Sequence, residues 1–365
     1  MRVQRVRLPG DGRVTWMVLG DDLLPVEPIQ KYLSYIENLQ KSPNTIQSYA
    51  YHLKLFWEFL RDSRLSWKDL SLEKRAEFIQ WLRSPDPRVV SLQQQQAKRT
   101  ERTINTIMAA VYSFYEFQEQ IGATERVDTY DYKYQPKRKY QSLLHHINKS
   151  KPVKQKLLKL KEPKAFPGTL SREQVKQLIE ACIRIRDKFL ICLLYETGVR
   201  IGEALGLRHE DIQSMGKSEI HVVPRNDNSN HARSKSGTER VIHTLQDLMS
   251  LYSEYLIEEY PDDIDCDYVF VNIWEGQRGS PMTYAAVDSL FRRLRKKTKI
   301  NVNPHLLRHT HATELIRAGW NMAYVQRRLG HANVQTTINT YVHLTGDDMR
   351  AEYEKYLQRK EESGE

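Results

Sequence analysis

The sequence predicts a mainly α-helical protein that carries a small antiparallel β-sheet. Apolar residues recur with a helical period in two regions, one between about residues 25 and 130 and one after about residue 167. Strict alternation is confined to short stretches, chiefly SEIHVVP and ERVIHTL. The length of 365 residues exceeds that of one average domain, so we expect two or three domains.

The charge balance indicates an anionic partner. The chain has 56 Lys or Arg against 46 Asp or Glu, a formal net charge of +10. No stretch approaches the ~18–20 uninterrupted apolar residues of a membrane span. No apolar run follows the basic N-terminus, so we expect no secretory signal and a cytoplasmic, nucleoid-associated protein. Its cysteines, Cys182, Cys192 and Cys266, are too far apart for a C-x-x-C pair.

The first part of the chain predicts a hairpin and then a helical domain. Residues 1–22 alternate around the turn PGDG and predict a β-hairpin-like extension. Residues 23–130 predict a helical domain, because capping candidates at 42–45 precede an apolar stripe and a second stripe follows Arg102. We expect the stripe residues to form a core: Tyr49, Leu53, Phe56, Trp57, Leu60, Ile104, Ile107, Met108, Val111, Tyr112 and Tyr115.

Residues 131–166 form a basic segment that follows the helical domain. Residues 133–164 hold eleven Lys or Arg and one acid, Glu162. Such a run fits either a solvated linker or a strap along a nucleic-acid backbone, and the interleaved tyrosines and bounding prolines favour the strap. The candidate DNA contacts in it are Lys137, Arg138, Lys139, Lys151 and Lys154.

A second domain is predicted over residues 167–348. Ser171 and Gln174 form a candidate capping box before two or three helices. SEIHVVP and ERVIHTL then predict two strands, and DYVFVN is either a further strand or a buried run. Helical patterns return in TYAAVDSLFRRLRKKT, PHLLRHTHATELIRAG and NMAYVQRRLG. The domain is therefore mainly helical with a small antiparallel sheet.

The stretch PHLLRHTHAT concentrates three histidines and one arginine. On a helix, His305, Arg308 and His309 share a face, and His311 points elsewhere. A metal site is disfavoured, because no carboxylate accompanies the first histidine and an arginine would repel a cation. A structural role suits His309 but suits Arg308 less well, because a guanidinium is rarely buried without an anion. A phosphate site accounts for both residues.

Two further patterns complete a recognisable set. ETGVRIGEAL contains Arg200 with Glu203 one turn later, and LGHANVQTTINTYVHL contains His331 and, ten residues on, Tyr341. The patterns TGxRxGEAL, HxLRHTxAT and LGHxxxxTTxxTY, in this order and spacing, resemble the tyrosine site-specific recombinases, or phage integrase family. The resemblance covers about residues 165–350 and, more loosely, the helical domain before them.

The resemblance implies a catalytic set and a mechanism. Tyr341 would attack a DNA phosphodiester, giving a 3′-phosphotyrosine bond and a free 5′-hydroxyl. Arg200 and Arg308 would bind the non-bridging oxygens, and His305 and His331 would donate hydrogen bonds and manage protons. Neither metal nor any other cofactor is then expected, and religation needs no ATP.

The remaining site residues also follow from the resemblance. Lys235, in a predicted hairpin, would protonate the leaving oxygen, although Arg233 and Arg240 compete for that role and the loop is long. We also expect Arg233 and Arg240 to contact DNA. Glu203 and His309 would support the site without taking part in the reaction.

The resemblance further implies an architecture and partners. The two domains would form a clamp around double-stranded DNA, and active complexes would be homotetramers. Residues 349–365 predict a charged helical tail that would pack onto a neighbouring protomer, a frayed terminus being the alternative. The N-terminal hairpin and the long strap favour a transposon or phage-type integrase, with accessory proteins as further partners and no membrane role.

Two other functions remain open at this point. A type IB topoisomerase shares the chemistry and relaxes supercoils, but the HxxRH and LGH set with a short tail favours a recombinase. A non-catalytic DNA-binding protein would need at least one of the six catalytic positions broken, and none is. A metal-dependent nuclease is disfavoured by the absence of a carboxylate cluster.

Overall fold

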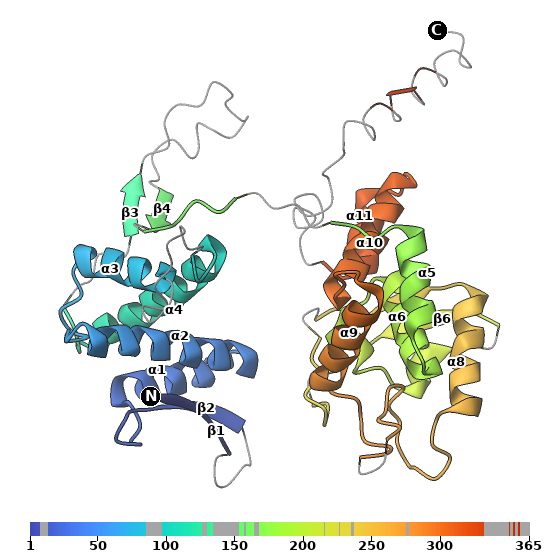
Figure 1. Cartoon of the computed structure of the whole chain (residues 1–365), viewed down its shortest axis with the longest axis horizontal. Coiled ribbons are helices and arrows are strands. Elements are labelled where there is room, and N and C mark those ends of the chain that lie inside the picture. Colours follow the sequence, from blue (N-terminus) through green and yellow to red (C-terminus); the bar gives the residue numbers. More distant parts are fainter. Residues whose placement is uncertain are drawn as a thin grey trace. The chain divides into compact units, whose positions relative to one another are not determined.

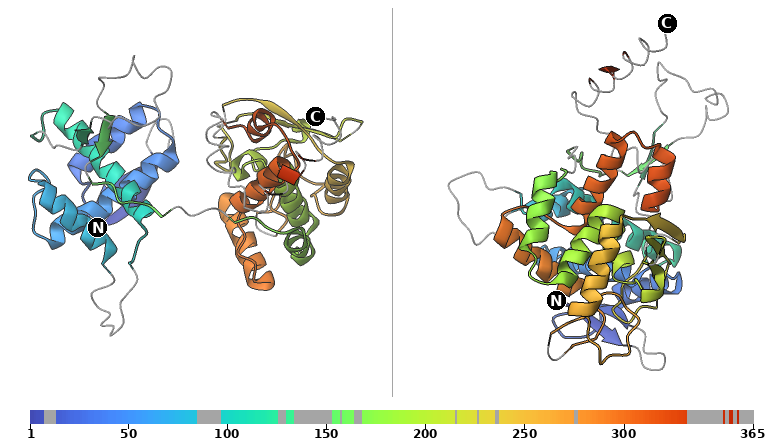
Figure 2. Two further views of the ribbon diagram at one scale, coloured as in Figure 1. Left: turned by 90° about the horizontal axis from the view of Figure 1, so that it is seen from above. Right: turned by 90° about the vertical axis from the view of Figure 1, so that its right-hand side faces the viewer.

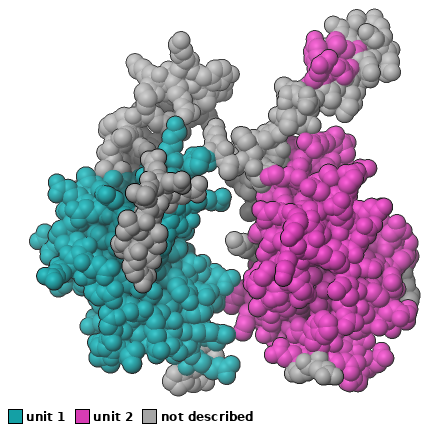
Figure 3. Space-filling view, viewed as in Figure 1, with its two compact units in different colours: residues 1–164 teal, residues 165–365 magenta. Residues whose placement is uncertain are grey.

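The chain divides into two compact units in a computed structural model. The units comprise Met1–Lys164 and Ala165–Glu365 (Figure 3). Within them the structure describes residues 1–7, 14–84, 97–125, 130–133, 153–156, 158–163, 168–214, 216–225, 227–234, 237–274, 277–331, 350, 353–354 and 357. Among these residues, no helix is both long and apolar enough to cross a lipid bilayer.

Unit 1 begins with the predicted hairpin. Strands β1 (Arg2–Arg7) and β2 (Val14–Leu19) pair antiparallel, with Val3 opposite Val18; the predicted PGDG turn lies outside the described residues. Val18 is buried in the core of the helical domain, so the hairpin is part of this unit's fold. The helices of the unit are α1 (Glu27–Asn38), α2 (Pro43–Asp62), α3 (Leu72–Arg83) and α4 (Glu101–Gln120) (Figure 1).

The predicted aromatic stripes meet at the centre of unit 1. Phe56 of α2 lies edge-on to Phe78 of α3, with ring centroids 5.1 Å apart, and to Tyr115 of α4 at 5.9 Å. Ser42 and Thr100 cap α2 and α4, each accepting a hydrogen bond from the backbone N–H three residues on. Spacing and capping thus position these helices as expected.

Part of the basic segment belongs structurally to unit 1. Strands β3 (Tyr130–Lys133) and β4 (Val153–Lys156) pair antiparallel, a pairing that the sequence did not predict. Farther on, the Asn105 side chain of α4 donates to the Leu160 carbonyl at 2.9 Å and accepts from the Leu160 N–H at 2.9 Å. It also donates to Glu162 at 2.8 Å. The end of the segment is therefore hydrogen-bonded to α4 through Asn105, a contact that we call the clip.

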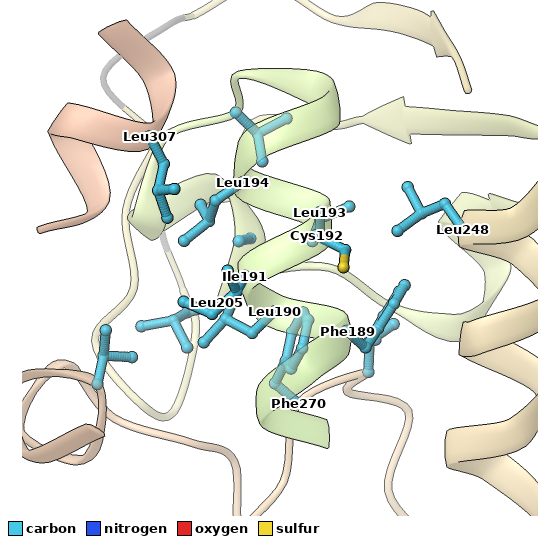
Figure 4. Close-up of a cluster of buried hydrophobic side chains, with 14 of the residues drawn as sticks. Phe189, Leu190, Ile191, Cys192, Leu193, Leu194, Leu205, Leu248, Phe270 and Leu307 are labelled. Carbon is cyan, nitrogen blue, oxygen red and sulfur yellow. The ribbon is translucent and has the colours of Figure 1, made fainter. Parts of the chain in front are cut away.

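Unit 2 is built around one buried helix. Its helices are α5 (Arg172–Ala181), α6 (Ile185–Thr197), α7 (Ile201–Ala204), the short 3-10 helix η1 (His209–Asp211), α8 (Gln246–Glu258), α9 (Tyr284–Thr298), α10 (Pro304–Arg317) and α11 (Met322–Leu329). Residues 189–194 of α6 are all buried, and Figure 4 shows them among Leu205, Leu248, Phe270 and Leu307. Helix α10 packs against both α6 and α11 (Figures 1 and 2).

In the described part of unit 2, the sheet has three antiparallel strands. The two predicted strands are β6 (Glu219–Val222) and β7 (Arg240–His243), and the two-residue β5 (Ile212–Gln213) adds to the edge of β6. Ile212, Ile220 and Ile242 align across the sheet and are buried. The stretch DYVFVN is a buried run with isolated bridges at Tyr268 and Val271, so the second alternative for it holds.

The clip at Asn105 can be tested by Asn105→Ala. Alanine favours helix, so α4 should persist, whereas the Leu160 N–H and carbonyl lose their partner at a cost of about 1–3 kcal/mol. Hydrogen exchange of residues around Leu160 should accelerate in this variant. Thr106→Ala removes a hydroxyl of the same stretch that donates within α4, to the Arg102 carbonyl, and serves as control. Equal exchange in both variants would contradict the clip.

Candidate active site

The carboxyl end of α11 presents three successive backbone carbonyls to three arginines. The helix ends at Gly330, which adopts the left-handed conformation with φ 65°. The last carbonyls of a helix have no partner within it and carry the negative end of its dipole. The carbonyls of residues 328, 329 and 330 each accept a hydrogen bond from a guanidinium.

Each of the three guanidiniums comes from a different element. Arg240 of β7 donates Nε to the Arg328 carbonyl at 2.8 Å. Arg308 of α10 donates Nη2 to the Leu329 carbonyl at 2.7 Å. Arg200, just before α7, donates Nη2 to the Gly330 carbonyl at 3.1 Å. The end of α11 thus brings together cations that are far apart in the sequence.

Arg308 is further fixed by the turn after α6. Its Nη1 donates to the carbonyl of Gly198, which ends α6 in the left-handed conformation with φ 64°. A Cβ atom at residue 198 would lie 2.7 Å from the His311 ring and 2.8 Å from Leu329. Only glycine therefore allows α6, α10 and α11 to approach so closely here.

Glu203 is the carboxylate of the cluster. Its side chain is 0% exposed and accepts from Arg240 Nη2 at 2.7 Å and from Arg200 Nη1 at 3.1 Å. Burial alone would raise the pKa of this carboxyl, but the hydrogen bonds and charges of Arg240 and Arg200 lower its pKa below the usual value. Glu203 is therefore a buried anion that orients two of the three guanidiniums.

The histidines of the predicted set differ in environment. His305 is exposed at the start of α10, and His309 is half-buried one turn later. His331 directly follows Gly330 and is half-buried. Burial and the neighbouring Arg308 and Arg200 lower the pKa of His331 to about 4. Its imidazole is therefore neutral near pH 7, with one donor and one acceptor nitrogen.

The end of α11 accordingly brings Arg200, Arg308 and His331 together, with Glu203 behind them. Arg233 is half-buried, and its backbone N–H donates to Tyr284 Oη at 3.4 Å. Lys154 lies in β4, and nothing is described of its side chain. The other expected residues lie outside the described part of the chain: Lys137, Arg138, Lys139, Lys151, Lys235 and Tyr341.

Arg240 does not lie where a DNA contact was expected. Its side chain is 5% exposed, and its guanidinium is bound to Glu203 and to the Arg328 carbonyl. The period of two in β7 explains the difference, because Arg240 and Ile242 share the face that packs on the core. The alternation ERVIHT contained this signal.

Comparison with known proteins decides the family. Residues 169–347 match the phage integrase family, and residues 29–121 match the phage integrase N-terminal SAM-like domain. A transposase A from transposon Tn554 of Staphylococcus aureus is 45% identical, over 99% of each chain. The chain belongs to the phage integrase family. It is a tyrosine recombinase, an enzyme of site-specific DNA recombination.

Other known proteins resemble this recombinase either in sequence or in fold. The tyrosine recombinase XerA of Pyrococcus horikoshii is 26% identical over 92% of this chain and 95% of its own. A solved complex of the Tn1549 transposon integrase with circular intermediate DNA has a TM-score of 0.63, with 19% identity over 90% of this chain and 99% of that one. A λ integrase dimer bound to a core site has a TM-score of 0.58, with 13% identity over 86% and 76%.

The sequence analysis assigned no role in this cluster to two polar residues, Arg328 and His311. Arg328 lies in the last turn of α11, three residues after the buried Val325. His311 lies on another face of α10 from Arg308, as expected, but it is buried and accepts a hydrogen bond from Arg328. Each follows a buried residue of its own helix by three or four positions, Val325 for Arg328 and Leu307 for His311. This spacing would have indicated that both side chains turn inward. Among the described residues, no group of three or more His, Cys, Asp or Glu could hold a metal ion.

Two histidines with lowered pKa values predict a loss of stability in mild acid. The pKa of His311 is lowered to about 3 by burial and by Arg328, and that of His331 is lowered to about 4. Since the unfolded chain binds these protons first, near pH 6.5, stability is complete above that pH and declines as the pH falls towards the folded-state values. Each histidine contributes a slope of up to about 1.4 kcal/mol per pH unit.

Urea unfolding between about pH 7 and about pH 5 measures this slope. His311→Gln should make the dependence of the unfolding free energy on pH shallower, by up to the contribution of one histidine. This holds whatever the variant does to the absolute stability. An unaltered slope in His311→Gln would show that this imidazole is not held neutral.

Proposed function

We propose that Arg200 and Arg308 bind the scissile phosphate of a DNA strand and that Tyr341 attacks it. The observation that supports this is the arrangement of guanidiniums at the end of α11, fixed by backbone carbonyls and Glu203. A guanidinium has five donors in a rigid fork, so it can keep these contacts and still bind phosphate oxygens. Arg200 is the more open of the two, with 19% of its side chain exposed.

The proposed reaction exchanges one phosphoester bond for another, so it needs no external energy source. The Tyr341 hydroxyl passes its proton to the accepting nitrogen of His331 as its oxygen bonds to phosphorus, and the bond from phosphorus to the 5′-oxygen breaks. Lys235 protonates that leaving oxygen, giving a 5′-hydroxyl and a 3′-phosphotyrosine. The 5′-hydroxyl of another strand reverses the step and joins the DNA. Arg200 and Arg308 stabilise the charge that develops on the non-bridging oxygens.

His331 is suited to accept and donate protons in this scheme. Because its pKa is lowered to about 4, it is neutral near pH 7 and can donate one hydrogen bond while its other nitrogen accepts. His305, exposed on the first turn of α10, would hydrogen-bond to the phosphate. His309, whose pKa is lowered by burial and by His305, would support the helix. Arg240 is reassigned from a DNA contact to the positioning of Glu203.

The biological role proposed is movement of a mobile element. The support is the 45% identity to a Tn554 transposase A over nearly the whole chain. Double-stranded DNA is the proposed partner, with Arg233 and the basic segment as further contacts. Within that segment we propose Lys137, Arg138, Lys139, Lys151 and Lys154 as phosphate contacts, in keeping with its charge.

We further propose a homotetramer in which each tail packs onto a neighbouring copy. A groove of about 820 Å³ in unit 2 supports this, because apolar side chains line it, among them Leu245, Trp320 and Tyr324. In the tail, Tyr353 and Leu357 are exposed and stand four residues apart, as on one edge of a helix. These two side chains would occupy the groove of the neighbour.

Covalent trapping tests the proposed chemistry. On a nicked duplex that carries its recombination site, the wild-type chain should form a protein–DNA adduct that survives detergent and forms in EDTA. Tyr341→Phe should abolish the adduct while DNA binding persists, because only the nucleophilic oxygen is lost. Tyr35→Phe, at an exposed tyrosine of unit 1, should trap as well as the wild type. An adduct that persists in Tyr341→Phe would exclude Tyr341 as the nucleophile.

A further inference from the structure

Arg328 joins the last turn of α11 to three other elements of unit 2. Its Nη2 donates to the Glu196 carbonyl near the end of α6 at 3.0 Å. Both Nη1 and Nη2 donate to the His243 carbonyl at the end of β7, at 3.1 Å each. Its Nε donates to His311 Nε2 of α10 at 3.1 Å. The planar fork of one arginine thus holds α6, β7 and α10 against α11.

His311 takes part in this junction as a neutral acceptor. Nε2 can accept from Arg328 only when it carries no proton. The ring is buried against Gly198, the residue whose carbonyl binds Arg308. Burial and the charges of Arg328 and Arg308 keep the pKa of His311 far below neutrality, which agrees with this hydrogen bond. The same ring therefore contacts both the Arg328 side chain and the turn that fixes Arg308.

The backbone of Arg328 links the junction to the active-site arginines. Its carbonyl is the first of the three at the end of α11 and accepts from Arg240 Nε. Arg240 in turn binds Glu203, which binds Arg200. Fixing the Arg328 side chain therefore fixes the direction of the carbonyls to which Arg240, Arg308 and Arg200 bind.

We propose that Arg328 and His311 are positioning residues that align Arg200 and Arg308 before DNA binds. This inference rests on the phosphate-binding role proposed above for those two arginines. Neither Arg328 nor His311 needs to touch DNA, because they act through the carbonyls of α11 and through Gly198. Loss of the junction should misplace the guanidiniums by a fraction of their hydrogen-bond length, which lowers the rate of cleavage more than it weakens DNA binding.

The neighbouring Arg327 provides a matched control. It lies in the same last turn of α11 and carries the same charge, but its side chain is exposed. Arg327→Ala and Arg328→Ala therefore change net charge and the helix-end dipole equally. Any difference between the two variants reports on the junction.

The test compares single-turnover adduct formation on the nicked duplex with equilibrium binding to the same DNA. Arg328→Ala should form the adduct about a hundredfold more slowly than Arg327→Ala, with dissociation constants within about threefold of each other. Arg328→Lys should restore little of the rate, because a single ammonium cannot span the three partners. His311→Gln should slow adduct formation by about tenfold without weakening binding. If Arg328→Ala does not fold, the His311→Gln variant alone carries the test.

Three results would overturn the proposal. Equal adduct rates in Arg328→Ala and Arg327→Ala would show that the junction does not align the arginines. A parallel loss of affinity and rate in Arg328→Ala would make Arg328 a DNA contact instead. A wild-type rate in His311→Gln would remove His311 from the mechanism. Failure of the proposed function itself is distinguishable, since the wild-type chain would then form no adduct at all.

Discussion

The site depends on the satisfaction of three backbone carbonyls at the end of α11. A helix ending leaves its last carbonyls without partners, and burial of such groups is costly unless donors meet them. Arg240, Arg308 and Arg200 supply the donors, and the carbonyls in return hold the guanidiniums in fixed directions. The same contacts therefore complete the fold of unit 2 and orient the groups that we propose for phosphate binding.

Among the described residues, the arginines at this helix end are held by one carboxylate and by several neutral groups. Glu203 is the carboxylate to which both Arg200 and Arg240 bind, while Arg308 and Arg328 are held by carbonyl dipoles and a neutral histidine. Neighbouring cations repel one another in a partly dehydrated setting, so we expect the cluster to attract an anion with more than one charge-bearing oxygen. A DNA phosphate meets this requirement, and it would stabilise the cluster as the cluster stabilises it.

Much of the fold was predictable because burial is periodic. The stripes of α2 and α4 and the alternation of β6 and β7 each follow from side chains such as Phe56 and Ile242 that face a core. The β3–β4 pair was not predictable, since its strands are short, are separated by 19 residues and lack alternation. Such strands form because of their pairing in the tertiary structure, which the local sequence pattern does not show.

The proximity of Arg200, Arg308 and His331 was predictable from the sequence, but the contacts that hold them were not. Motif spacing identified Arg200, Arg308 and His331, yet no spacing shows that helix-end carbonyls hold them. Arg240 was expected to contact DNA, and Arg328 drew no prediction, because basic residues are common in hairpins and in last helical turns. Their inward direction follows from the buried faces of β7 and α11, marked by Ile242 and Val325.

Rotation of the guanidiniums in the DNA-free chain tests the central claim most directly. Nitrogen-detected NMR of arginine side chains measures how fast each group turns about its Nε–Cζ bond. We expect Arg308 and Arg240 to turn much more slowly than the exposed Arg327, because two-sided hydrogen bonds to carbonyls or to Glu203 hold them. Rotation of Arg308 and Arg240 as fast as that of Arg327 would contradict a site that is aligned before DNA arrives.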